Sequence, residues 1–349
     1  MPTDRVPIYM WLHLRTCTHL AQMLEIPEKY VSTVFGDDIR QTWVGNNYGM
    51  EGIVHENEND SHTDFWQVKW IKKGDFNQVE HHPLSNASDV EISKFNLPFN
   101  QIDRLLKLME PLAEFEQEYF IGSDISPCLF ELYWRLCGME QTIIDFVENP
   151  SRAHMMLAKC RDFSVSLAQS VIKKYKIDWV WTGDDIGSQA GMMISPAMWR
   201  ELIKPRLKDI FEVIKSAGLF VAFHSCGSIR PIIPDLIEIG CDVLNPIQCN
   251  CEGMDPVELK KEYGKELSFM GGVDTQGVLP NGNAEQVYAA TSKLIESMTS
   301  DGGGYILAAS HTIPPETPDE NIFAMYRAAG LSKEDIFDRA AEIRKLQNR

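Results

Sequence analysis

The second half of the chain alternates short apolar runs with amphipathic stretches, and this alternation limits the possible folds most strongly. A helix between two successive strands returns the chain to the end of the sheet where the first strand began, so the two strands pair in parallel. Antiparallel neighbours need only a short turn between them. With earlier apolar runs near 39 and 120, the repeat count favours a closed (β/α)8 TIM barrel over an open doubly wound sheet. The expected later strands are 177–182, 219–223, 242–244, 267–270 and 305–308.

Helix and turn signals organise the rest of the chain. Asn149, followed by proline, is typical of a helix start, and Pro205 is expected to kink the helix around it. Residues 45–95 are polar and rich in turn residues, with alternating apolar residues over 64–70, which predicts a hairpin-containing insertion. We expect a single domain over 1–349, made of the barrel, an N-terminal extension and this insertion.

The composition excludes several classes of function. The 349 residues are 44% hydrophobic, and the formal net charge is −17, with a pI of about 5.0. Such an acidic chain without a basic run is not expected to bind nucleic acid. No leader-like start and no 18-residue apolar run are present, so we expect neither export nor membrane insertion. Eight scattered cysteines indicate a reducing cytoplasm. The oligomeric state stays open.

Polar side chains follow five consecutive predicted strands at their carboxyl ends. Barrel active sites lie at that end of the strands, so five such positions favour a functional site over isolated turn residues. The individual positions could still be structural, for example an aspartate that caps a turn. The residues are Asp184 and Asp185, His224 and Cys226, Asn245 and Gln248, Asp274, and His311.

The most informative pair is His224 and Cys226, which follow the apolar run at 219–223. Side chains alternate along a strand, so residues two apart share a face if the extended geometry continues through Ser225. Imidazole and thiolate suit zinc, with bonds of roughly 2.0–2.1 Å to nitrogen and 2.3 Å to sulfur. The pair therefore predicts part of a zinc site, against the alternative of two buried side chains satisfied by their neighbours.

Taken together, the motifs resemble the uroporphyrinogen decarboxylase superfamily, and within it the cobamide-dependent methyltransferase branch. The resemblance runs from residue 4 to about 329 and implies a TIM barrel. Its motifs are Gly-Asp-Asp-Ile-Gly from 183, Ser-Pro-x-x-Trp from 195, Lys-Pro-Arg from 204, His-Ser-Cys-Gly from 224, Asn-Pro-Ile-Gln from 245, Gly-Val-Asp-Thr-Gln from 272 and Ser-His from 310.

The resemblance also implies a metal site. Thiol-methylating members of the family hold zinc with a His-x-Cys pair and a later cysteine. The pair maps onto His224 and Cys226, and His311 occupies the position of the later cysteine. A histidine can bind zinc, so His311 is the expected third ligand, with Cys249 and Cys251 as alternatives. Losing a sulfur ligand makes a thiol acceptor less expected.

The reaction that this resemblance implies is methyl transfer from a small methylated donor, an aryl methyl ether, to a corrinoid. Zinc would polarise the ether oxygen, and Asp184 or Asp185 would protonate the departing phenolate or orient the metal site. The chain lacks the Asp-x-His-x-x-Gly cobamide signature, because Phe65 stands where the glycine would follow Asp60 and His62. The corrinoid is therefore expected on a separate protein.

The remaining polar residues are expected to contact the substrate. Asn245, Gln248 and Asp274 follow strands, and Met192 is expected to pack under a substrate ring. Each also has a structural alternative as a turn or rim residue.

Three other functions stay open. One is a methylcobamide:thiol methyltransferase, and another is a non-catalytic protein that binds a corrinoid or a metal-bound ligand. The third is a decarboxylase of the uroporphyrinogen type, which grips carboxylates with paired arginines near the N-terminus. In the matching stretch, residues 10–15, only Arg15 is present, so decarboxylation is disfavoured.

Overall fold

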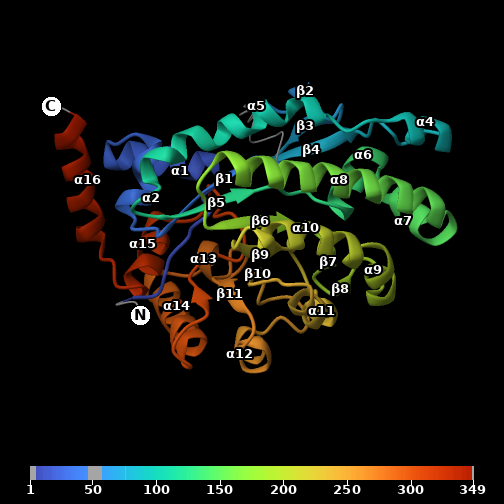
Figure 1. Ribbon diagram of the computed structural model, residues 1–349. Helices are drawn as coiled ribbons and strands as arrows, with labels where there is room; N and C mark the ends of the chain where they lie inside the picture. The colour runs from blue at the N-terminus through green and yellow to red at the C-terminus, as the bar shows by residue number, and fades with distance from the viewer. Residues whose placement is uncertain (1–4, 46–56, 75, 348–349) are drawn as a thin grey trace.

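The computed structural model describes residues 5–45, 57–74 and 76–347, and a curled parallel sheet lies at its centre (Figure 1). The strands follow one another around the sheet in chain order, as right-handed β–α–β units require. The predicted barrel-type α/β fold is confirmed. The strands are β1 (Ile39–Trp43), β5 (Phe120–Asp124), β6 (Trp179–Gly183), β9 (Phe220–His224), β10 (Val243–Ile247), β11 (Ser268–Gly271) and β12 (Tyr305–Ile306).

The N-terminal segment around Ile8 fills the gap between the first and last strands of this sheet. The Tyr9 amide donates to the Leu307 carbonyl at 3.0 Å, and the Asp38 amide donates to the Ile8 carbonyl at 2.8 Å. Ile8 and Leu307 also form a parallel bridge. The segment therefore connects the residue after β12 to the residue before β1, and part of the expected N-terminal extension contributes to the barrel wall.

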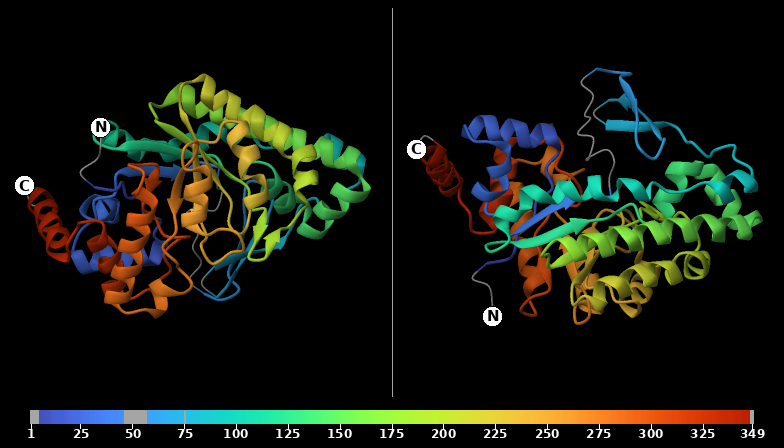
Figure 2. Two further views of the ribbon diagram at one scale, coloured as in Figure 1. Left: turned by 90° about the horizontal axis from the view of Figure 1, so that it is seen from below. Right: turned by 45° about the horizontal axis from the view of Figure 1, so that its top comes forward.

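Helices surround the sheet (Figures 1 and 2). Among the described residues, no helix is both long enough and apolar enough to span a membrane. The helices are α1 (Leu14–Leu24), α2 (Val31–Val34), α4 (Asp89–Lys94), α5 (Ile102–Leu106), α6 (Phe130–Cys137), α7 (Met139–Glu148), α8 (Pro150–Lys174), α9 (Pro196–Leu202), α10 (Lys204–Ser216), α11 (Ile233–Glu238), α12 (Pro256–Tyr263), α13 (Val278–Asn281), α14 (Ala284–Thr299), α15 (Asp319–Ala328) and α16 (Lys333–Gln347), with 3₁₀ turns at Glu28–Tyr30, Phe99–Gln101, Lys107–Phe115 and Arg230–Ile232.

The helix signals in the sequence have clear structural counterparts. The Asn149 side chain accepts a hydrogen bond from the Arg152 amide and caps α8. The proline at 205 coincides with a break that separates α9 from α10. The helix α5 is followed directly by a 3₁₀ helix, Lys107–Phe115, that contains Pro111. A proline cannot donate the backbone hydrogen bond that a continuous α-helix needs there.

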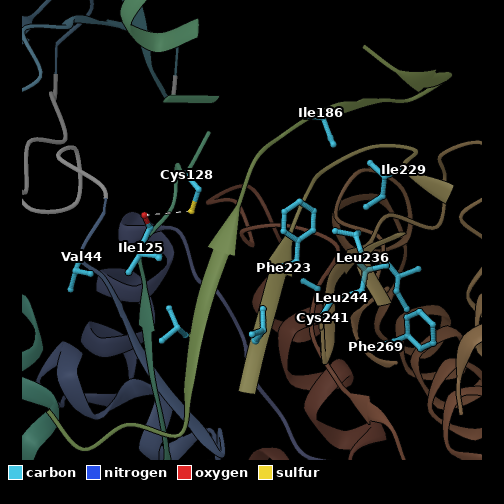
Figure 3. Close-up of a cluster of buried hydrophobic side chains, with 14 of the residues drawn as sticks. Val44, Ile125, Cys128, Ile186, Phe223, Ile229, Leu236, Cys241, Leu244 and Phe269 are labelled. Carbon is cyan, nitrogen blue, oxygen red and sulfur yellow. Dashed lines mark hydrogen bonds between the residues drawn. The ribbon is translucent and has the colours of Figure 1, made fainter. Parts of the chain in front are cut away.

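Alternating side chains give the central strands two different faces. On β9, Val221 and Phe223 pack into the layer between sheet and helices, whereas Ala222 belongs to the cluster inside the sheet. Figure 3 shows Phe223 in the outer layer with Leu236 of α11 and Leu244 of β10. Because residues two apart share a face, this alternation turns His224 toward the interior of the barrel.

The insertion is a three-stranded antiparallel sheet that projects from the barrel (Figure 2). Its strands are β2 (Ser61–Thr63), β3 (Lys69–Lys73) and β4 (Phe76–His81). The alternating stretch over 64–70, which was predicted to form a hairpin, begins with a turn. The Asp64 carboxylate holds this turn by accepting from the amides of Trp66 and Val68 at 2.8 and 2.9 Å. The first part of the predicted insertion, 46–56, lies outside the described residues.

Candidate metal centre and active-site crevice

The end of β9 brings His224 and Cys226 together. The Nε2 atom of His224 lies 3.5 Å from the Sγ atom of Cys226, and both side chains are partly buried. The loop that follows is held by a close backbone contact, since a Cβ atom on Gly187 would lie 2.5 Å from the Cys226 carbonyl oxygen. Gly227, at φ +83°, packs against Gly187 in turn. The two glycines therefore fix the path of the chain that carries the cysteine.

The orientation of the His224 ring is set by Asn245 on the neighbouring strand β10. The two residues are in register, and His224 Nδ1 lies 2.7 Å from Asn245 Oδ1. The Asn245 amide nitrogen donates to the Met270 carbonyl at 3.3 Å, which identifies Oδ1 as the acceptor for the imidazole. Nδ1 then carries the hydrogen, and Nε2 is left as the lone-pair donor that a metal requires.

Asp185 is the third member of this group. The ligand atoms of Asp185, His224 and Cys226 all lie within 4.8 Å of one another, and within the described part of the chain they form the one set of three that meets this criterion. Asp185 Oδ1 also accepts from the Cys226 amide at 2.8 Å. Nitrogen, sulfur and oxygen ligands at this spacing suit a borderline divalent ion such as zinc.

The protonation of Cys226 depends on its surroundings. Burial raises the pKa of its thiol well above the usual value, and the negative charges of Asp185 and Glu131 raise it further. A bound divalent cation acts in the opposite direction and deprotonates a coordinating thiol. The site is therefore arranged for a cation to balance its negative charge.

His311 faces this group from the end of β12 without belonging to it. Its ring stacks on Trp11 with centroids 5.5 Å apart, and its centroid lies 6.4 Å from that of His224. The ring is open to solvent at the mouth of the barrel but crowded by protein. Desolvation by the surrounding protein atoms, and to a smaller extent the nearby His224, lowers the pKa of His311 to about 4. Its role as a zinc ligand stays a prediction.

The two aspartates that follow β6 have different environments. The Asp184 side chain is fully buried. Its Oδ1 atom accepts from the amides of Leu129 and Glu131 at the start of α6, both at 2.9 Å. Burial raises the pKa of Asp184 to about 8, although these hydrogen bonds oppose the shift. Asp184 thus anchors α6, whereas Asp185 reaches the metal-type group. A catalytic role for either stays a prediction.

The residues predicted to bind substrate lie in three places. Asn245 lines the crevice beside His224, and Gln248 Oε1 accepts from the Gly227 amide at 2.8 Å, which braces the loop after Cys226. Asp274 lines a separate cavity of about 310 Å³ near α12 and α14. Met192 lies in a short antiparallel ribbon of β7 (Gly187–Ser188) and β8 (Gly191–Met192).

The alternative cysteine ligands lie outside the group of three. Cys249 lines the cavity near α12 and α14, and its thiol donates to the Gly272 carbonyl at 3.5 Å. Burial raises the pKa of Cys249 to about 11. Cys251 is buried and lies beside Asn250. Arg15, the one arginine of the N-terminal motif, is exposed near the start of α1.

Sequence reasoning missed an aromatic wall around His224. Trp181 stacks on the His224 ring with centroids 5.7 Å apart, and Trp11 meets it edge-on at 6.1 Å. Trp43 lies behind Trp11 at 5.8 Å, and Tyr9 lies 6.3 Å from Trp181. The alternation of Tyr9 with Trp11 was the one signal in the sequence, since residues two apart in an extended segment share a face.

These aromatic residues enclose a narrow crevice. Its cavity volume of about 10 Å³ has room for about one water molecule. The lining residues are Tyr9, Trp11, Trp181, His224, Asn245, Pro246, Met270, Ala308, Ala309 and His311.

Comparison with known proteins decides the family. The sequence profile of uroporphyrinogen decarboxylase (URO-D) matches residues 68–330, which is most of the chain. This chain belongs to the URO-D family. The resemblance inferred from the motifs is thereby confirmed.

The URO-D relatives include methyltransferases. A methylcobamide:CoM methyltransferase, MtbA, of Methanosarcina mazei is 25% identical over 268 residues, which cover 74% of each chain. A methylated-thiol–coenzyme M methyltransferase from the same organism is 22% identical over 264 residues, covering 73% of this chain and 67% of the relative. A uroporphyrinogen decarboxylase of Thermus thermophilus is 26% identical over 132 residues, which cover 37% of this chain and 35% of that enzyme.

A solved structure supports the URO-D fold. A methyltransferase from Methanosarcina mazei superimposes with a TM-score of 0.68 at 16% identity, and the match covers 94% of both chains. At this identity the likeness concerns the fold alone.

Proposed function

We propose that this chain is a metal-dependent methyltransferase that moves a methyl group from a small aryl methyl ether to a corrinoid carried by a separate protein. The observation that carries the proposal is the group of Asp185, His224 and Cys226 at the carboxyl ends of β6 and β9. The relatives that are named as methyltransferases of cobamides and methylated thiols support methyl transfer.

The donor atoms fit zinc. Asn245 leaves His224 Nε2 directed toward Cys226 and Asp185, each 3.5 Å away. Three protein ligands leave one tetrahedral position for a substrate oxygen. Zinc in this place would supply Lewis-acid polarisation of the ether oxygen. His311 is kept as a further candidate ligand, because its ring borders the same crevice.

The protein's own groups would orient the donor. When the bond between the methyl carbon and oxygen breaks, both electrons stay on oxygen, which becomes a phenol after gaining a proton. The reduced corrinoid, in its cobalt(I) form, would supply both electrons of the new bond to the methyl carbon. Asp185 has a side chain that is 39% exposed, so it can act at the crevice, whereas Asp184 is occupied by backbone amides. Trp11 and Trp181 provide flat surfaces for an aromatic ring.

Metal analysis and a methyl-transfer assay test the proposal. Purified protein should contain one equivalent of zinc, and the variants His224→Ala and Asp185→Ala should lose it. The variant His311→Ala decides whether that side chain is a ligand. Incubation with cob(I)alamin and methoxyarenes should yield methylcobalamin and the free phenol, and chelation should abolish this conversion. Zinc-loaded protein that converts none of the donors would contradict the proposal and favour a binding protein.

A second candidate is methyl transfer from a methylcobamide to a thiol, which the names of two relatives favour. In the same assay, methylcobalamin and coenzyme M would then give methyl-coenzyme M, while methoxyarenes would stay unchanged. Binding of the thiol to the metal would shift the absorption of a cobalt(II)-substituted protein. Methoxyarene turnover without thiol methylation would exclude this candidate.

A further inference from the structure

The crevice beside His224 has no cationic side chain among its described lining residues. That lining consists of aromatic, aliphatic and amide side chains and two histidines. An anionic substituent that enters the crevice would therefore meet no lysine or arginine there.

Asp185 and Glu131 are the carboxyl groups beside His224, and the arginine next to Glu131 is already paired. Asp185 Oδ1 lies 3.5 Å from His224 Nε2. Glu131 at the start of α6 forms an ion pair with Arg135 at 2.5 Å, and the Arg135 guanidinium lies over the Trp70 ring. Arg135 is thus already engaged by one carboxylate and one indole. It is not available for a substrate anion.

A metal ion does not reverse this balance. A divalent ion held by the carboxylate of Asp185 and the thiolate of Cys226 has its two positive charges matched by two negative ligands. The site with its metal is then close to neutral and offers little net positive charge to an anion.

The walls of the crevice favour a planar ring. Trp11 is partly exposed and stacks on His311 with an interplanar angle of 30°. With a cavity volume of about 10 Å³, a donor reaches His224 only if this stack opens. An aromatic donor can replace the stacking contact that Trp11 gives up, which an aliphatic donor cannot do.

We propose that this crevice selects uncharged or cationic aromatic methyl donors over anionic ones, and that Trp11 is the specificity-determining residue that receives the donor ring. This inference deepens the proposed function and rests on it, because a bound aromatic ether is a methyl donor only in a methyltransferase. Its binding part can be tested without any turnover.

Three ligands with the same methoxyphenol ring provide the test: guaiacol is neutral, vanillate carries an added carboxylate, and vanillylamine carries an added ammonium group. Binding to the zinc-loaded full chain would be measured by calorimetry. Guaiacol and vanillylamine should bind at least about tenfold more tightly than vanillate, because a buried carboxylate would lack a partner. Equal or tighter binding of vanillate would overturn the inference.

Variants of Trp11 assign the role to a residue. Trp11→Phe should keep most of the affinity for guaiacol, and Trp11→Ala should lose about tenfold, in line with a lost stacking contact plus buried area. Trp11→Arg should raise the affinity for vanillate relative to guaiacol. Trp134→Phe, which changes a tryptophan on α6 that does not line the crevice, is the control and should leave all three affinities unchanged. Unchanged guaiacol affinity in Trp11→Ala would contradict the role of Trp11.

The outcomes separate the two proposals. If guaiacol binds in preference to vanillate but no methylcobalamin forms, the methyl transfer is wrong and the selectivity stands. If methylcobalamin forms equally well from vanillate, the methyl transfer stands and the selectivity is wrong.

Discussion

His224 Nδ1 lies 2.7 Å from Asn245 Oδ1, so a residue on β10 determines which nitrogen of a β9 histidine faces Cys226 and Asp185. Asn245 was expected to touch substrate, and the structure gives it a second possible task. An amide oxygen that accepts from Nδ1 keeps the ring in one orientation and makes Nε2 the nitrogen available to a metal.

The first prediction concerns this hydrogen bond. Asn245→Leu removes the acceptor, and zinc affinity should fall by about 10- to 100-fold, as is usual when a partner of a metal-bound histidine is lost. Asn245→Asp keeps an oxygen in place and serves as the control, with affinity close to that of the unchanged protein. Competition with a chromophoric chelator measures both values. Equal affinity of Asn245→Leu and the unchanged protein would remove Asn245 from the metal site.

The second prediction concerns the packing of Gly187 on the loop that carries Cys226. In Gly187→Ala the new methyl group would lie 2.5 Å from the Cys226 carbonyl oxygen, so the loop must move. We expect zinc affinity to fall by about tenfold or more while far-ultraviolet circular dichroism stays unchanged. Gly303→Ala is the matched control, because nothing lies within 4 Å of its Cβ position. Normal zinc binding by Gly187→Ala would show that the loop adapts freely.

The third prediction concerns the pH dependence of stability. Burial raises the pKa of Asp124 from 3.8 to about 8, opposed by hydrogen bonds from Ser126, and raises that of Asp37 to about 7. Folding therefore favours their protonated forms. The resulting stabilisation is complete below about pH 4 and is lost as the pH rises through 7 to 8. The free energy of unfolding should accordingly decrease from about pH 5 to about pH 9.

Isosteric variants test this assignment by urea unfolding. Asp124→Asn cannot ionise, so the decrease between about pH 5 and 9 should become smaller by at least about 1.4 kcal/mol, the equivalent of one pKa unit. Asp335→Asn is the control, because this exposed carboxyl has a lowered pKa and is ionised throughout that range. An identical slope in Asp124→Asn would mean that Asp124 is ionised in the folded protein at neutral pH.

The fourth prediction concerns a buried ion pair that holds the helices around the barrel. Arg152 Nε lies 3.0 Å from Asp145 Oδ2, and Tyr133 also donates to that oxygen at 2.7 Å. Arg152 additionally donates to the Ala87 carbonyl at 2.7 Å, which ties α8 to the end of the insertion. Arg152→Leu leaves the Asp145 carboxylate without its cation and should destabilise the fold by about 3–5 kcal/mol.

Thermal unfolding compares this variant with an exposed pair. Lys208→Leu removes the partner of Glu212, at 3.6 Å on the surface of α10, and should change stability by no more than about 0.5 kcal/mol. A comparable loss in both variants would mean that general surface charge, and not the buried pair, supports these helices.

Much of the fold was predictable because strand and helix signals are local. Apolar runs, Asn149 and Pro205 each act on their own neighbours, so their effects can be read from the chain. The N-terminal segment at Ile8 was read as an extension, yet it pairs with Leu307. A single bridge to a residue about 300 positions away leaves no local signal. The turn at Asp64 is local but was missed as well, because the apolar alternation over 64–70 also fits a strand, while one side chain there satisfies two amides.

The candidate site divides in the same way. The sequence by itself singled out His224 and Cys226, and the alternation of the β9 strand explains why His224 faces the barrel interior. Cys226 follows the end of β9 on a loop whose path is fixed by Gly187 and Gly227. The sequence also determined the family motifs. Only the tertiary structure decided that Asp185 joins this pair while Asp184 caps α6, and that Trp11 and Trp181 enclose the histidine. Those choices depend on distances between separate strands, which are set when the barrel curls and not by spacing along the chain.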